Sequence, residues 1–574
     1  MQLPEAQELI KRFEYLKGRR NNFEKAWQDI TDLMMPYRGD ITTKRSQGQR
    51  RVKGVFDTTA MNAADSFVNF IKGAIIPSGN DWVRLRAKAP FSDVLAVRQV
   101  LDVVGERILA ALADSNFYKE SATFLRDFAV LGNGTLHVRE DIPRLGKKNR
   151  GTFGGLVFEA VPIGHIWFQV GHRGRPNYIV RQVVMTALDA FRFFEGAAGP
   201  DVEYKLNAGD PMGEVSFLHF VFENEDFIPG GVISPEDREY VGVYVAGAGD
   251  ASLGKGGIGG PTVIRKAGYD TCPYIVARWM VVDGEEYGRG RGHLARADAM
   301  GINELRRQIL IAAGKDLNPP LMVEHDTVVE LDITPNGLMV TRPAVKMGPQ
   351  YLKSDTNYAI ADAIARQDRD QIQKAFLGDI LEEPDTQPRS AEESRQRQNR
   401  ALSRLSASAD TVNYEFLDPL IQSVIDIMYR AGSLPELDYL QEMAPDADFE
   451  IVYQSPFFTA QRQSGVTRVQ AFMERRLALF QVTQDPIWLD DLNSSEATNY
   501  DARVSDVPAQ ILRSPEEVSA IRQARAEQKQ VEQRMAQMQQ VAAMQQGGPQ
   551  QGPPQQGPPK QRAPQQGSGT NGQV

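Results

Sequence analysis

The chain has 574 residues, of which 41% are hydrophobic and 24% charged, and its net charge is −9 at pH 7. This length allows about four domains of roughly 150 residues, and the composition is typical of a globular chain. The net negative charge disfavours an extended surface that binds nucleic acid. A single cysteine, six scattered histidines and no apolar run near the ~18 residues of a membrane span exclude a disulfide framework, a Cys- or His-rich metal site and a transmembrane helix.

The first ~75 residues are predicted to be helical, and the N-terminus lacks the apolar segment of a secretory signal. A first helix ends at Pro36, and Asp57 is expected to cap a second helix that runs to Pro77. Helices are also expected over 95–112 and 115–131, and the turn Gly132-Asn133-Gly134 is expected to close the second of them. The apolar positions that recur at helical spacing in the first two helices are Phe23, Trp27, Ile30, Met34, Ala60, Ala64, Phe67, Ile71 and Ala74.

The loop 38–53 between these helices carries six basic residues and one acidic residue, Asp40. A solvated surface loop is the simplest interpretation. A loop that faces phosphate or a neighbouring subunit is the alternative.

From Gly134 to Met280 short runs rich in Val, Ile, Phe and Tyr alternate with Gly and Pro breaks. This pattern predicts a mostly antiparallel sheet. The expected strands are 156–161, 166–170, 178–185, 216–222 and 239–245.

A helical pattern returns over 293–317, where the next residues, Asn318-Pro319-Pro320, stop it. A compact β insertion is expected over 321–353, with Pro335-Asn336-Gly337 as its turn. A second helix is expected over about 355–376. Two helices, each about 35 Å long at ~1.5 Å per residue, would therefore flank a small β module.

The C-terminal part begins with a polar loop, 378–388, after which Ser390 to Glu393 fits a capping box and opens a helix reaching Arg430. Asp418-Pro419 is expected to kink this helix. Ser514-Pro515 predicts the start of another helix, whose weak heptad seam needs a partner. Residues 547–574 hold eight Gln, seven Gly and six Pro and are expected to be disordered.

No motif predicts an enzyme, a cofactor site or a metal site. Gly249 to Lys255 fits G-x-x-x-x-G-K, but it lacks the following Ser/Thr and a helix, so it is interpreted as a flexible loop. Gly288 to Gly292 is expected to form a tight entry into the helix that follows. The acidic pairs Glu382-Glu383 and Asp490-Asp491 have no recognisable third ligand, and Cys272 is expected to be a buried small residue.

The order of several short blocks resembles the head-to-tail connector (portal) protein family of short-tailed bacteriophages. The resemblance extends from Trp27 to about Gln523. The blocks that carry it are Val55 to Ala60 with Pro77 and Trp82, Asn116 to Tyr118 with Leu131 to Gly134, Glu286 to Gly290 with Asn303 to Leu305 and Pro319-Pro320, Glu393 with Arg395 and Arg397, Glu415 to Leu420, Gly432 to Pro435, and Tyr453 to Pro456 with Ala460-Gln461.

The resemblance implies an α+β, mainly helical portal-type fold with a helical stem, a β-containing wing and clip, and a C-terminal helical crown, assembled as a ring. The divisions that it implies are a wing over 1–287, stem helix 1 over 288–317, the clip over 318–354, stem helix 2 over 355–378, a tunnel loop over 379–389, the C-terminal part of the wing with its long helix over 390–510, a crown helix over 511–546 and the disordered Gln/Pro/Gly tail over 547–574.

The implied function is a ring, typically a dodecamer, at one capsid vertex, through which double-stranded viral DNA is packaged and ejected. The implied partners are a terminase motor, tail adaptor or nozzle proteins, and the major capsid and scaffolding proteins, with no membrane. The protein would be assembled in the host cytoplasm and reside in the virion. The candidate residues are Glu382, Glu383, Asp385 and Arg389 for the DNA channel, and Asn336, Lys346 and Lys353 for docking at the clip.

Two other classes of protein remain open at this point. One is a scaffold or adaptor of a virion without a channel, for which a monomer in solution would be evidence. The other is an enzyme with an unrecognised site, for which ATPase activity in the purified protein would be evidence.

Overall fold

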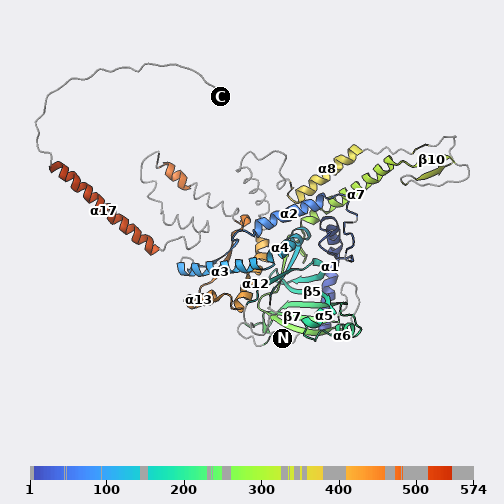
Figure 1. Ribbon diagram of the computed structural model, residues 1–574, viewed down its shortest axis with the longest axis horizontal. Coiled ribbons are helices and arrows are strands. Elements are labelled where there is room, and N and C mark those ends of the chain that lie inside the picture. Colours follow the sequence, from blue (N-terminus) through green and yellow to red (C-terminus); the bar gives the residue numbers. More distant parts are fainter. Residues whose placement is uncertain are drawn as a thin grey trace, which may run out of the picture. The chain divides into compact units, whose positions relative to one another are not determined.

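A computed structural model describes residues 5–141, 153–228, 237–247, 260–324, 337–341, 350–351, 358–378, 409–458, 472–481 and 515–545, with Ser234 and Thr334 and without residues 44, 47, 53, 92–93 and 480. The chain divides into two units, Met1–Ala509 and Gln510–Val574. All elements below belong to the first unit unless stated (Figure 1).

The N-terminal helices form where the apolar periodicity predicts them. They are α1 (Ala6–Met34), α2 (Thr59–Ile75), α3 (Leu95–Asp114) and α4 (Phe117–Arg126), which continues into a π-helical turn, η2 (Asp127–Leu131). The apolar stripe of α2 is buried in the main core, as are Trp27, Ile30 and Met34 of α1. The predicted amphipathic faces are therefore confirmed.

The β region forms two antiparallel sheets rather than one. The first has the order β3-β2-β9 and the second the order β4-β5-β6-β7-β8. The strands are β2 (Asn133–Glu140), β3 (Leu156–Ala160), β4 (Ile166–Val170), β5 (Pro176–Thr186), β6 (Glu214–Glu223), β7 (Tyr240–Ala246), β8 (Thr262–Tyr269) and β9 (Tyr274–Arg278), with a 3-10 turn, η3, at Ile163–His165. Strands β2, β8 and β9 were not predicted, and Asn133 begins a strand where the sequence predicted a turn.

Helices cover the five-stranded sheet on both faces. Leu9, Phe13 and Leu16 of α1 pack in one cluster with Trp167 and other apolar residues of this sheet. Two short helices between β5 and β6, α5 (Ala187–Phe193) and α6 (Pro200–Asn207), form a second cluster around Phe217. Because successive residues of a strand face opposite sides, Phe217 and its neighbours in β6 serve both clusters.

The predicted helix–β–helix segment is also present. Helix α7 (Arg291–Leu317) and helix α8 (Tyr358–Ala375) lie side by side and lead into β10, β11 and β12 (Figure 1). In that module β10 (Leu321–Glu324) pairs in parallel with β11 (Leu338–Thr341) and antiparallel with β12 (Gln350–Tyr351). Gly337 N–H donates to the Thr334 carbonyl at 2.9 Å, while Pro335 and Asn336 of the predicted turn lie outside the described residues. The parallel pairing of β10 with β11 shows that these two strands do not form a simple hairpin.

The described C-terminal part of the first unit begins with α11 (Ala409–Val412), a second π-helical turn, η6 (Asn413–Leu417), and α12 (Asp418–Arg430). The π turn lies just before Pro419, where a kink was predicted, because proline cannot donate the regular helical hydrogen bond. Helix α13 (Pro435–Met443) follows, and β13 (Phe449–Tyr453) pairs with β1 (Val83–Ala87). In the second unit, α17 (Pro515–Gln545) begins at Pro515, where the sequence predicts the start of a helix.

Candidate functional site at the root of the helix pair

The helix pair α7–α8 leaves the body of the protein at a root built from glycines. Gly132 has φ +90°, and a Cβ there would lie 2.3 Å from the Gly290 nitrogen. A Cβ on Gly290 would in turn lie 2.4 Å from the Val130 carbonyl oxygen. Because no side chain fits either position, the start of α7 can approach η2 at backbone distance.

Hydrogen bonds fix this approach. The Asn133 amide donates to the Gly288 carbonyl at 2.9 Å, and its oxygen accepts the Gly288 N–H at 2.7 Å. Asn133 is buried, and its side-chain amide forms one donated and one accepted hydrogen bond with the Gly288 backbone, as a residue of a paired strand does. The predicted tight entry at Gly288–Gly292 is thus confirmed, with an asparagine from a distant block as its counterpart.

Each π-helical turn places a buried carboxylate against one arginine. Asp127 in η2 accepts two bonds from the Arg38 Nε atom, at 2.8 and 2.9 Å, and one from its terminal nitrogen. Glu415 in η6 accepts the Arg278 backbone N–H at 2.7 Å and its guanidinium at 2.6 Å. Burial raises the pKa of Asp127 although Arg38 opposes that shift.

The sequence contains a pattern from which these two buried carboxylates could have been predicted. Asp127 lies in the run Asp-Phe-Ala-Val-Leu, and Glu415 lies in Tyr-Glu-Phe-Leu, so each carboxylate interrupts an apolar helical stretch. A charge at such a position needs a buried partner. Which arginine provides it is set only by the tertiary fold.

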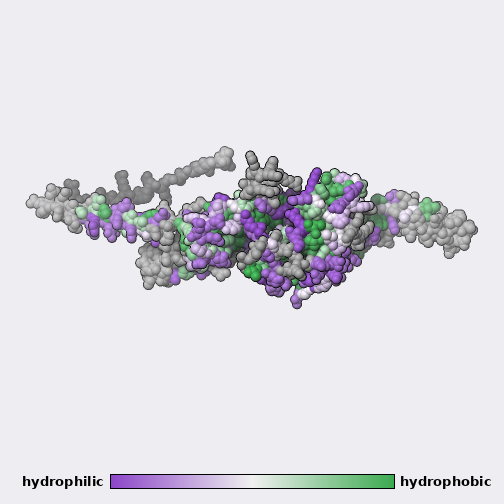
Figure 2. All heavy atoms as spheres, turned by 90° about the horizontal axis from the view of Figure 1, so that it is seen from below, coloured by the Kyte–Doolittle hydropathy of each residue, from purple (hydrophilic) through white to green (hydrophobic). Residues whose placement is uncertain are grey.

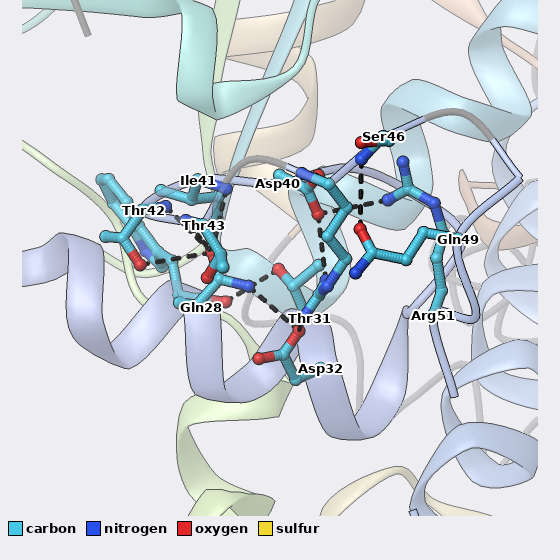
Figure 3. A network of polar contacts seen from close by, with 12 residues as sticks. Gln28, Thr31, Asp32, Asp40, Ile41, Thr42, Thr43, Ser46, Gln49 and Arg51 are labelled. Atoms are coloured by element: carbon cyan, nitrogen blue, oxygen red, sulfur yellow. Dashed lines mark hydrogen bonds and ion pairs between the residues drawn. The ribbon is translucent and has the colours of Figure 1, made fainter. Parts of the chain in front are cut away.

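The basic loop 38–53 is held on α1 by an internal network (Figure 3). The Gln28 amide oxygen accepts the backbone N–H groups of Ile41 and Thr42, each at 2.9 Å. Arg45 pairs with Asp32 at 2.7 Å and Asp40 at 2.9 Å. The other ion pairs of the loop's described residues are Arg51–Asp40 and Arg38–Asp127. Three of its arginines therefore contact carboxylates of the same chain, which argues against a loop dedicated to phosphate.

The two sheets meet at a buried polar layer around His219. The ring of His219 stacks on Tyr244 with centroids 3.9 Å apart, and its Nδ1 lies 2.7 Å from the Tyr274 hydroxyl. Burial lowers the pKa of His219 well below 6.5, and the charges of nearby His137 and Arg181 lower it further. The same layer contains the His137–Tyr274 stack and the Arg181–Glu159 ion pair, and Arg265 also acts on His219.

We expect this layer to make the protein acid-labile. In the unfolded chain His219 would bind a proton as the pH falls below about 6.5, whereas in the folded protein its lowered pKa keeps it neutral. The free energy of unfolding is therefore highest above pH 6.5 and falls as the pH drops below it. At pH 5 a single histidine that stays neutral in the folded protein lowers the free energy of unfolding by about 2 kcal/mol. Urea unfolding at pH 7, 6 and 5 measures this loss. His219→Phe should reduce the pH dependence and His172→Asn, at an exposed position, should not; equal slopes in all three proteins would contradict the assignment.

The described residues offer little to catalysis. No group of three or more His, Cys, Asp or Glu side chains among them is placed to hold a metal ion. Cys272 is half-buried rather than fully buried as predicted. Desolvation still raises the pKa of its thiol to about 12, so the thiol remains protonated and unreactive at neutral pH. None of the described helices is both long and apolar enough to span a membrane.

The candidate residues from the sequence lie outside the part of the chain that the structure describes. For the channel these are Glu382, Glu383, Asp385 and Arg389, and for the clip they are Asn336, Lys346 and Lys353. The loop Gly249–Lys255 and the pair Asp490-Asp491 also lie outside it. Asp57 is described, but α2 begins at Thr59 and its N-cap is Thr58, one residue after the predicted cap. The Asp57 carboxylate nevertheless accepts the Thr59 N–H at 2.9 Å.

Comparison with known proteins adds independent evidence. A family described as bacteriophage head to tail connecting protein matches residues 6–512. The portal protein of Salmonella phage epsilon15 is 26% identical over 547 residues, which cover 92% of each chain. The probable portal protein of Bordetella phage BPP-1 is 22% identical over 536 residues, 91% of each chain. A solved chain from the virion of a native gene transfer agent particle aligns with 75% of this chain and 92% of its own at 11% identity, but its TM-score of 0.33 is too low to establish a shared fold.

Proposed function

The chain belongs to the bacteriophage head to tail connecting protein family, and we propose that it forms a ring-shaped channel for double-stranded DNA at one vertex of the capsid. The observation that carries this proposal is the family match over residues 6–512 together with two portal relatives that align along nearly their whole length. The chain is a structural component of a phage particle and not an enzyme, because the family is one of connectors. Neither a channel-free scaffold nor an unrecognised enzyme is favoured.

Apolar side chains on the helix pair support the ring. Leu294 of α7 and Ile360 of α8 are 56% and 59% exposed. Met300, Ile311 and Ile364 on the same two helices are also exposed. Figure 2 shows that hydrophobic residues lie among hydrophilic ones on the visible face of the molecule. A heterologous interface, in which α7 of one subunit packs against α8 of the next, would bury these side chains of the two helices and close into a ring.

Native mass spectrometry and negative-stain images of the purified chain test the ring. We expect one closed species of about twelve subunits, a copy number that rests on the family. Ile364→Glu should prevent closure, whereas Tyr204→Glu, at an exposed position on α6, should not. Only monomers or dimers across protein concentrations and salt concentrations would refute the ring.

Within this proposal α7 and α8 are the stem, and the β module between them is the clip. Residues 1–287 and 390–510 form the wing, and 511–546 form the crown. Terminase and the tail adaptors would dock on the clip near Asn336, Lys346 and Lys353, while the capsid and scaffolding proteins would contact the wing. The particle would assemble in the host cytoplasm.

Deleting residues 547–574 is expected to leave ring assembly intact. The Gln/Pro/Gly composition of this tail cannot bury enough apolar surface to stabilise an interface. Native mass spectrometry of the truncated chain should give the same species as the full chain. Loss of rings would show that the tail is structural.

A further inference from the structure

Residues 54–57 connect the basic loop to α2, and side chains of both long helices hold this short segment. Asn303 of α7 accepts the Phe56 N–H at 2.7 Å and donates from its amide to the Gly54 carbonyl at 2.9 Å. Arg369 of α8 donates to one Asp57 carboxylate oxygen, at 2.7 Å from a terminal nitrogen and at 3.2 Å from Nε. One four-residue segment therefore contacts both members of the helix pair.

The Asp57 carboxylate does more than accept the Thr59 N–H at the start of α2. Its side chain is only 6% exposed, and its two oxygens have different partners, the Thr59 N–H and the Arg369 guanidinium. Burial alone would raise the pKa of Asp57, but the Thr59 hydrogen bond and the Arg369 pair outweigh it and lower that pKa. Asp57 is therefore a charged group at neutral pH, and its geometry is fixed on both sides.

The loop that precedes this segment is also held by the rest of the chain. The preceding loop is bound to α1 through Gln28 and through the Asp32–Arg45–Asp40 ion pairs (Figure 3). The segment is continuous with α2 on its C-terminal side. A polar connection thus runs from α1, through the loop and residues 54–57, to α7 and α8.

We propose that residues 54–57 are a strut that sets the angle of the helix pair α7–α8 against α1 and α2, with Asp57 and Asn303 as positioning residues. Apolar contacts such as that of Phe376, which directly follows α8, with Phe67 of α2 can slide, whereas directed hydrogen bonds to backbone groups define one position. If the pair is the stem of a channel, which rests on the proposed function, the strut sets the width of that channel.

The test measures the position of the helix pair directly. In a Cys272→Ser background, spin labels at Ser66→Cys on α2 and Gln371→Cys on α8 report one intrasubunit distance when labelled chain is diluted with unlabelled chain. Wild type should give a single narrow distribution. Asp57→Asn and Asn303→Ala should shift or broaden it by more than its wild-type width. In the same variants the Phe56 and Asp57 amides should exchange hydrogen faster.

Two matched controls keep the test specific. Arg366→Gln removes an exposed ion pair with Asp362, three residues before Arg369 on α8. Gln308→Ala removes an exposed hydrogen bond to Glu304, and it changes a side chain five residues after Asn303 on α7. Both should leave the distribution unchanged, and Arg369→Lys should disturb it less than Arg369→Gln.

Distributions in Asp57→Asn, Asn303→Ala and Arg369→Gln that match the controls would overturn the strut. Arg369→Gln changes a side chain that is 36% exposed, so it answers the question even if the Asp57 variant does not fold. The distance measurement does not depend on ring closure. Absence of rings in wild type would therefore count against the proposed function and not against the strut.

Discussion

Replacing Glu415 with Gln is expected to lower the free energy of unfolding by about 3–5 kcal/mol, which is the usual cost of removing one partner from a buried ion pair. The side chains of Arg278 and Glu415 are only 6% and 7% exposed, so the variant leaves a buried guanidinium without its counter-charge. It also weakens the anchor that η6 provides for the end of β9. Urea unfolding followed by intrinsic fluorescence measures the change.

The matched control is Asp448→Asn. Asp448 pairs with Lys88 where both side chains are exposed, so water replaces the lost contact and the unfolding midpoint should not move. An equal effect of the two substitutions would show that burial does not set the importance of the Glu415 pair.

Local chemistry explains what could be predicted from the sequence. Helices α1 and α2 were predicted because their apolar stripes repeat over several turns. The start of α17 was predicted because Ser-Pro at a helix start leaves few alternatives. The strands with alternating burial and aromatic or β-branched residues, such as β6, were also found. In each case the signal lies within one element.

Long-range pairing explains what was missed. Strand β1 pairs with β13, more than 350 residues later, and nothing in the sequence of either strand indicates its partner. Strand β2 was missed because Gly132-Asn133-Gly134 looks like a turn, whereas here Gly132 allows a close helix contact and Asn133 bonds to Gly288. The roles of Asn303 and Arg369 likewise exist only after the fold brings residues 54–57 between two helices.

The candidate channel residues depend on a different kind of argument. The segment Asp379 to Arg389 has four carboxylates and one cation, three net negative charges per subunit, and its two prolines exclude a regular helix. In the family the corresponding corner projects into the channel beside DNA, and this placement is a proposal for the present chain. A ring of such loops would repel phosphates and centre the duplex, with a range of about 8 Å at physiological salt.

Replacing Glu382, Glu383 and Asp385 with Lys is therefore expected to preserve the ring but slow or stall DNA packaging. The three substitutions turn each loop from three net negative charges to three net positive charges, so the loops would hold phosphates where they now repel them. In packaging assays the defect should weaken as salt is raised, because screening removes the attraction. The matched control carries the same charge change at the exposed residues Glu203, Asp210 and Glu225, and it should package normally. Normal packaging and full DNA retention by intact rings of the loop variant would refute the channel role. A channel whose wall binds phosphates strongly could not let DNA pass at the wild-type rate.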